Sequence, residues 1–234
     1  MKTINTLLCT AGILACATAS QAAILNPDSS FASGDRAASA NFNQVGTSLV
    51  VTLTNTFAGD TLDSSHLLTA LFFDIAAPLS AVGGSATITA GTIFGAACSP
   101  GPCTGATTNV GGEWEYLGGL AGTPNGATKG ISSTGLGLFG DANLNGPNLD
   151  DPTALNGANF GLSSAGDNTA TGNGGLLGVP FVKNSTVFSL GGLTAGQNYT
   201  ISNVFFLYGT ALTECGGACG GGGEADWASE RRYL

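Results

Sequence analysis

Apolar and polar residues alternate most clearly near the end of the chain, between residues 193 and 208. Apolar side chains recur there at every second position, which is the period of a β-strand with one buried face. They are Tyr199, Ile201, Phe205 and Leu207, and only Asn203 interrupts the series. Leu193, Gly196 and Tyr199 have the spacing L-x-x-G-x-x-Y just before this strand. Since a tyrosine at such a corner hydrogen-bonds back to the backbone in antiparallel sandwiches, the segment predicts a packed all-β domain.

Other segments show strand patterns as well. Residues 38–43 and 49–54 alternate on either side of a glycine-containing turn and predict an antiparallel hairpin. Residues 68–75, LTALFFDI, are almost continuously apolar, as in a central strand covered on both faces. A short helix is the alternative there, but the β-branched and aromatic content favours a strand. Further strands are expected at 86–90, 113–116 and 187–190. No window has the 3.6-residue apolar period of a helix.

The region from 118 to 180 differs from the rest, because Gly, Asn, Ser and Thr dominate it and apolar residues are sparse. We expect long loops with a few short strands, wrapped around the domain and anchored to its core by Phe139 and Phe160. The predicted fold class is therefore all-β, an antiparallel β-sandwich of jelly-roll or Ig-like type with long Gly/Asn-rich loops.

The first 22 residues have the pattern of an export signal. Lys2 supplies a positive start, residues 7–17 form an apolar run too short to span a bilayer, and Ser20-Gln-Ala22 is a small-x-small cleavage site. Residues 13–16, ILAC, also resemble a lipobox in which Cys16 would be lipidated, although Leu14 is bulky for that motif. We expect a signal peptide at 1–22, a β-sandwich domain at 23–214 and no transmembrane span in the mature chain. The predicted destination is the cell surface or the extracellular space.

Charge limits the choice of partners. The chain carries 6 Lys and Arg against 15 Asp and Glu, a formal net charge of −9. Without a basic patch, neither nucleic acid nor an anionic membrane surface is an expected partner. Only 9% of the residues are charged, so Gly, Ser, Thr and Asn supply most of the polar surface, which suits contact with a matrix or polymer.

Two of the six cysteines lie in the predicted signal. Cys98 and Cys103 bracket the turn sequence Ser-Pro-Gly-Pro, which brings their thiols together and predicts a disulfide in an oxidising compartment. Zinc binding is the alternative, but the chain has a single histidine. Cys215 and Cys219 belong to a glycine-rich tail, 215–234, that we expect to be disordered or aberrant, and whether they pair stays open.

The strongest candidate for a metal site starts at Asp141. Residues 141–146 match the beginning of a calcium loop, D-x-N-x-N-G, in which alternate oxygen donors surround a hard cation. The twelfth position, where a bidentate Glu belongs, is Pro152. The alternative is an Asx-turn loop whose side chains bond their own backbone. The candidate calcium ligands are Asp141, Asn143, Asn145, Asp150 and Asp151.

No convincing catalytic set is present. His66 follows Asp63 and two serines, but Ser–His–Asp triads are assembled from residues distant in sequence, and the chain has no G-x-S-x-G elbow. Glu113 and Glu115 flank Trp114, as a glycosidase carboxylate pair beside an aromatic ring would. Their spacing instead favours an acidic face towards solvent over a buried Trp114 face. We expect a protein that is not an enzyme and needs no cofactor.

Several segments of residues 23–214 resemble bacterial exosortase-dependent surface proteins, which normally carry a PEP-CTERM sorting tail. The likeness rests on SLVVTLTN at 48–55, LFFD at 71–74, GISS and GL within 130–136, LN and NFG within 155–161, and VFFLYGT at 204–210. The resemblance implies export, residence at the cell surface or in the extracellular matrix, and association with exopolysaccharide or biofilm. It implies no catalytic residues.

The tail departs from that family. After Glu214 the chain enters a glycine run and lacks both the Pro-Glu-Pro motif and the apolar span. Either this copy is released rather than sorted, or the tail is truncated or frameshifted. We favour the frameshift, which an intact alternative reading frame downstream of the Glu214 codon would support.

The sequence thus predicts a secreted or cell-surface structural protein linked to exopolysaccharide or biofilm, with exopolysaccharide or other surface proteins as partners. A calcium-assisted carbohydrate-binding module, using the loops around 141–173, is the alternative. A glycan hydrolase is a third, which would need Glu113, Glu115, Asp141 or Asp151 to converge in one cleft.

Overall fold

The computed structural model describes residues 23–88, 93–94, 109–155, 157–168, 176 and 179–214, with the backbone alone for 93–94. The predicted signal peptide, the pairing of Cys98 with Cys103, and the glycine-rich tail lie outside these residues.

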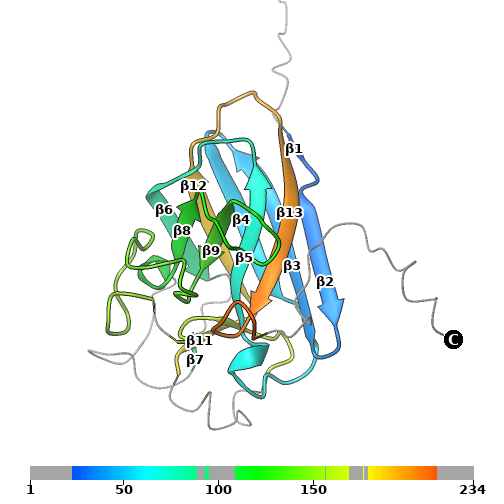
Figure 1. Ribbon diagram of the computed structural model, residues 1–234, viewed down its shortest axis with the longest axis vertical. Helices are drawn as coiled ribbons and strands as arrows, with labels where there is room; N and C mark the ends of the chain where they lie inside the picture. Colours follow the sequence, from blue (N-terminus) through cyan, green and yellow to red (C-terminus); the bar gives the residue numbers. More distant parts are fainter. Residues whose placement is uncertain are drawn as a thin grey trace, which may run out of the picture.

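The chain forms two β-sheets that pack face to face (Figure 1). The first has five strands in the order β2-β3-β4-β12-β6, all paired antiparallel. Their bounds are Asp28–Ser33 (β2), Arg36–Val45 (β3), Ser48–Asn55 (β4), Ser185–Gly191 (β12) and Ser80–Ile88 (β6). The hairpin predicted at 38–54 is thus confirmed, extended at both ends.

The second sheet has eight strands, and its main path runs β1-β13-β5-β10-β11-β7. β9 pairs with β5, and β8 pairs with β9. The bounds are Ile24–Leu25 (β1), Tyr199–Tyr208 (β13), Leu68–Ile75 (β5), Leu162–Ser163 (β10), Phe181–Lys183 (β11), Ile93–Phe94 (β7), Lys129–Ser132 (β9) and Glu115–Gly118 (β8). Only β1 with β13 and β10 with β11 pair in parallel in this sheet.

The only helices in the described part of the chain are two short 3₁₀ turns, Ser64–His66 (η1) and Gly111–Glu113 (η2). Neither is long enough to cross a membrane, so the described residues hold no helical candidate for a span. The prediction of an all-β sandwich is confirmed.

The core forms because the strands of the five-stranded sheet turn most of their large apolar side chains inward. Phe42 of β3 packs against Phe73 of β5, with ring centroids 5.2 Å apart. β5 is buried on both faces, since Leu68, Phe72 and their neighbours up to Phe73 have no exposed surface or nearly none. Residues 68–75 are therefore a central strand, as their continuous apolar run predicts.

The tyrosine corner is confirmed in atomic detail. The hydroxyl of Tyr199 accepts a hydrogen bond of 2.9 Å from the backbone N–H of Thr194. Gly196 lies between them with a φ of +82°, a conformation that L side chains rarely adopt. Asn203, which breaks the apolar alternation, has a φ of +52° and lies where the register of β13 against β5 shifts. The interruption in the sequence therefore marks a β-bulge.

The long loops behave as expected at their two anchors. Phe160 is fully buried and Phe139 is 8% exposed, with its ring 6.2 Å from that of Phe72 on β5. Both phenylalanines belong to the main body of the domain's apolar core. Anchoring of the 118–180 region by these two rings is thus confirmed.

Candidate functional site

The five-stranded sheet has an outer face that is mostly polar. Because directly paired residues share a face, the side chains opposite the buried Phe42 and Val51 point away from the core. These outward residues, called the outer face below, are Asp28, Ser30, Ala32, Ala37, Ser39, Asn41, Asn43, Val45, Ser48, Val50, Thr52, Thr54, Ser85, Thr87, Val187 and Ser189. Among them Asp28 carries the only charge.

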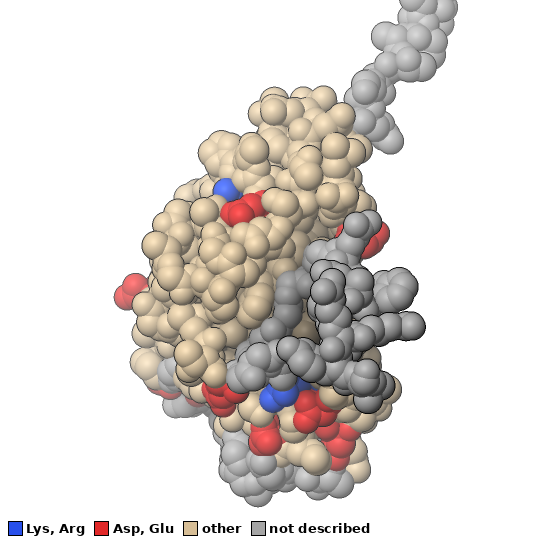
Figure 2. All heavy atoms as spheres, turned by 45° about the vertical axis from the view of Figure 1, so that its right-hand side comes forward, with Lys and Arg blue, Asp and Glu red and all other residues tan. Residues whose placement is uncertain are grey.

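The low charge extends beyond this face. In Figure 2 acidic and basic side chains are sparse over the middle of the visible surface and gather mainly towards its lower end. Hydroxyl and amide groups therefore provide most of the hydrogen-bonding capacity of the outer face. Such groups donate and accept equally well, as a partner rich in hydroxyls requires.

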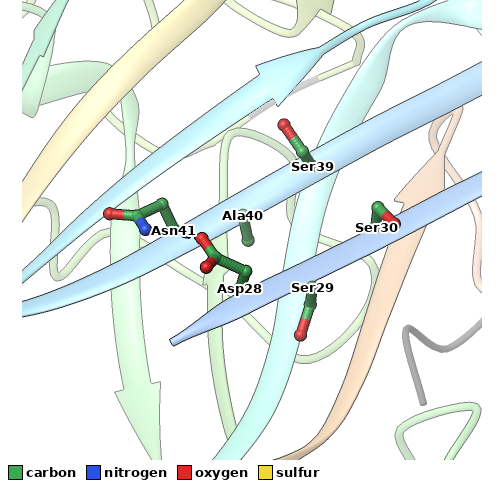
Figure 3. A pocket seen from close by; sticks show the side chains of 6 residues that line it. All are labelled: Asp28, Ser29, Ser30, Ser39, Ala40 and Asn41. Carbon is green, nitrogen blue, oxygen red and sulfur yellow. Dashed lines mark hydrogen bonds between the residues drawn. The ribbon is translucent and has the colours of Figure 1, made fainter. Parts of the chain in front are cut away.

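A pocket of about 200 Å³ lies on the β2–β3 pair of this sheet (Figure 3). Its lining residues are Asp28, Ser29, Ser30, Ser39, Ala40 and Asn41. The Asn41 amide donates a hydrogen bond of 2.7 Å to Asp28 Oδ1, which orients both side chains at the pocket. The polar alternation of Ser39, Asn41 and Asn43 is the sequence signal for this surface, but it does not locate the pocket.

The predicted acidic face at Glu113 and Glu115 is wrong. The two carboxylates are only 7% and 2% exposed, and Trp114 between them has no exposed surface. Part of the reason is local, because residues 111–113 form η2 and the strand begins only at Glu115. The larger reason is that residues 140–151 hydrogen-bond to these carboxylates and share in burying them. The burial of Trp114 itself, which excludes sugar stacking on its ring, is as predicted.

Backbone N–H groups of the covering segment satisfy these two carboxylates. Glu113 Oε1 accepts from the N–H groups of Leu149 and Asp150, and Glu115 Oε2 accepts from that of Gly140 at 2.6 Å. Burial nevertheless raises the pKa of Glu113 to about 7, with Asp150 and Asp151 adding to the rise. Burial also raises the pKa of Glu115, and the Gly140 N–H partly offsets the rise.

Three of the five candidate calcium ligands, Asn143, Asp150 and Asp151, make hydrogen bonds with residues in or near the predicted loop. Asn143 donates to the carbonyls of Gly112 and Thr153, the latter at 2.8 Å. Asp150 accepts from Asn159, and Asp151 accepts from Asn148 at 3.2 Å. Asp141 and Asn145 are exposed.

Within the described residues, no group of three or more His, Cys, Asp or Glu side chains is placed to hold a metal ion. Two amide oxygens of the loop, Asn143 Oδ1 and Asn148 Oδ1, are buried without a hydrogen-bond partner. Calcium binding by Asp141, Asn143, Asn145, Asp150 and Asp151 therefore stays a prediction, with the two asparagine oxygens as its structural support.

His66 takes part in a hydrogen-bond network. Its Nε2 lies 2.8 Å from Asp35 Oδ2 in the turn between β2 and β3. The Ser65 hydroxyl donates to Asp63 at 2.6 Å, so it points to a carboxylate and not to the imidazole. Arg36 donates to the Ser65 carbonyl at 2.9 Å. The histidine thus links the β2–β3 turn to η1. Ser65 and His66 are not hydrogen-bonded to each other as a Ser–His–Asp triad requires.

No family model, no curated protein and no solved structure matches the chain.

Proposed function

We propose that the protein is an exported, non-enzymatic component of the cell surface or extracellular matrix that contacts exopolysaccharide. The observation that supports this proposal best is the outer face, a broad strand surface of Ser, Thr and Asn with one charge. The resemblance of residues 23–214 to exosortase-dependent surface proteins and the signal-like residues 1–22 support the destination.

The chemistry of the outer face suits long polar polymers better than one small ligand. Each hydroxyl or amide contributes a net binding free energy of only about 1 kcal/mol when it replaces a hydrogen bond to water by one to a sugar hydroxyl. The face carries no aromatic ring for a sugar to stack on. A single contact is therefore weak, and affinity comes from many contacts repeated along a polymer. The Asp28–Asn41 pocket gives this surface one indentation where a hydroxyl receives both a carboxylate and an amide partner.

The test is retention of the mature protein on exopolysaccharide extracted from the producing cells. We expect Ser39→Ala/Asn41→Ala to reduce retention several-fold, because it removes two polar groups from the centre of the outer face. The matched control is Thr200→Ala/Ser202→Ala, which removes two exposed hydroxyls from the other sheet. Equal retention of both variants, or equal loss in both, would contradict a role of the outer face.

Two further measurements test the rest of the proposal. Mass spectrometry of fractionated cells should find Ala23 as the first residue of protein outside the cytoplasm. Incubation with the same polysaccharide should release no shorter glycan. Glycan turnover that disappears when one carboxylate is substituted would instead support the hydrolase alternative.

The second candidate function is a calcium-assisted carbohydrate-binding module. The unpartnered oxygens of Asn143 and Asn148 favour it, because amide oxygens are ligands for hard cations. A glycan array run with and without a chelator distinguishes the two functions. Binding that vanishes with chelator and with Asn143→Ala supports the module, and binding that ignores chelator supports contact through the outer face.

A further inference from the structure

Two loops with the same Ala-Gly-Asp sequence meet at one end of the sandwich. Residues 58–61 follow β4 of the five-stranded sheet, and residues 165–168 follow β10 of the eight-stranded sheet. Their aspartates bond reciprocally. Asp60 Oδ1 accepts the N–H of Asn168 at 2.8 Å, and Asp167 Oδ1 accepts the N–H of Thr61 at 3.1 Å. Each carboxylate thus receives the N–H of the residue that follows the other aspartate.

Close backbone contact locks the two loops together. A Cβ atom on Gly166 would lie 1.8 Å from the Ala58 carbonyl oxygen, so only glycine allows this crossing. The Ser164 N–H donates to the fully buried Thr61 hydroxyl at 2.9 Å, and the Ser164 hydroxyl donates to the Gly59 carbonyl. The two aspartates are therefore held in place by their backbones.

The Asp167 carboxylate lies where the two loops cross, and only one of its two oxygens has a hydrogen-bond partner. Asp167 is 5% exposed, and its Oδ2 makes no hydrogen bond. Ser163, fully buried beside it, also has an Oγ without a hydrogen-bond partner. Lys183 donates its Nζ to the Asp167 backbone carbonyl at 2.7 Å and not to the carboxylate. A buried carboxylate of this kind needs a proton or a cation.

The electrostatics agree with that need. Burial raises the pKa of Asp167, and the adjoining Asp60 carboxyl raises it further, while the Thr61 N–H lowers it. Two carboxyl groups in contact cannot both remain ionised at low cost without a compensating positive charge.

We propose that Ca²⁺ binds between Asp60 and Asp167, with Asp167 Oδ2 and the Ser163 hydroxyl among its ligands. The donors are oxygen atoms of two carboxylates and a hydroxyl, a set that favours a hard cation over zinc or copper. Calcium also tolerates irregular coordination, whereas Mg²⁺ demands a near-ideal octahedron. The ion joins the loop after β4 to the loop after β10 and so ties the two sheets together. This site is separate from the 141–151 loop and does not depend on polysaccharide contact.

The experiment measures thermal unfolding of the full mature protein, first in chelator and then in CaCl₂, with MgCl₂ and NaCl at matched ionic strength. Calcium at about ten to a hundred times its Kd should raise the Tm of the wild type by about 3–10 °C. Asp167→Asn and Asp60→Asn should lose this shift. Asp167→Asn should also have a Tm in chelator at or above that of the wild type, because it removes one of the two facing charges.

Two controls assign the ion and cover variants that fail to fold. Asp141→Asn, in the other candidate loop, should retain the calcium shift. Isothermal titration of CaCl₂ into the wild type measures binding directly. The proposal is overturned if titration shows no binding, if NaCl or MgCl₂ shifts the Tm as much as CaCl₂, or if Asp141→Asn and not Asp167→Asn abolishes the response.

Discussion

Glu113 and Asp167 are both buried carboxylates that accept backbone N–H groups from a segment distant in the chain, yet their surroundings differ. Glu113 receives two N–H groups on one oxygen and lies near Asp150 and Asp151. Asp167 receives one N–H on Oδ1, has no partner on Oδ2 and adjoins Asp60.

The different surroundings of Glu113 and Asp167 stabilise a buried carboxyl group in two different ways. Glu113, whose pKa is raised to about 7, is protonated in a large fraction of molecules near neutral pH and so carries less charge than an exposed glutamate. Burial and the adjoining Asp60 raise the pKa of Asp167 as well, and because its Oδ2 has no hydrogen-bond donor this carboxyl takes either a proton or the proposed cation. Neighbouring carboxylates raise the pKa at both sites, but the number of donors that already serve the buried group decides whether an ion is needed.

The largest expected effect tests a feature that the two regions share. Gly112 lies against the Pro147 carbonyl as Gly166 lies against that of Ala58, with a Cβ atom 1.9 Å and 1.8 Å away respectively. Gly112→Ala and Gly166→Ala should each lower the free energy of unfolding by about 3 kcal/mol, because backbone must move. Urea denaturation measures this.

The control for these variants is Gly140→Ala, since a Cβ atom there would meet nothing within 4 Å. It should change stability by no more than about 0.5 kcal/mol. A mild effect at Gly166 with a strong effect at Gly112 would mean that the two Ala-Gly-Asp loops are not locked, which would separate the two regions further.

The second prediction concerns pH. The pKa of Glu113 is raised from 4.5 to about 7, so the folded protein binds more protons than the unfolded chain between these values. The free energy of unfolding should therefore fall as pH rises through this window, by roughly 1–3 kcal/mol. Glu113→Gln keeps an oxygen for the N–H groups of Leu149 and Asp150 but cannot ionise, so it should remove most of this fall. An unchanged pH profile in Glu113→Gln would assign the fall to other groups.

Local patterns predicted the parts of the molecule that local physics determines. The Tyr199 corner and the bulge at Asn203 depend on neighbours within a few residues, and the alternation of β13 was visible for the same reason. The burial of Glu113 and Glu115 was missed because the covering groups lie 25 to 37 residues further along the chain. Strand periodicity distinguishes two faces but does not reveal a loop that covers the outer one.

The Asp60–Asp167 site was missed for a related reason. Its reciprocal hydrogen bonds join residues more than a hundred positions apart. The repeated Ala-Gly-Asp triplet was the one available signal, and it is too short to distinguish from chance in a chain with 38 glycines. The pairing of β5 with β10 and the backbone hydrogen bonds from Ala165 to Asn55 and from Gly166 to Phe57 bring the second loop next to the first.

A third prediction tests how rigid the Asp60–Asp167 region is. Thr61→Val keeps the side-chain shape but removes the oxygen that accepts the Ser164 N–H. Since Thr61 is fully buried, this N–H would lose its partner, and the free energy of unfolding should fall by about 1.5 kcal/mol. Thr200→Val, on an exposed position, is the control and should stay within about 0.5 kcal/mol of the wild type. Equal stability of the two variants would mean that water reaches the loop crossing.

The smallest expected effect returns to Glu115, where charge and hydrogen bonding can be separated. Glu115→Gln retains an oxygen that accepts the Gly140 N–H and removes a charge that burial already disfavours. Its free energy of unfolding at pH 7 should therefore differ from that of the wild type by less than about 1 kcal/mol. Glu115→Ala removes the acceptor as well and should cost about 1–3 kcal/mol more. If both variants lose the same stability, the covering segment is held by the negative charge itself, and Glu115 then resembles Asp167 more closely than Glu113.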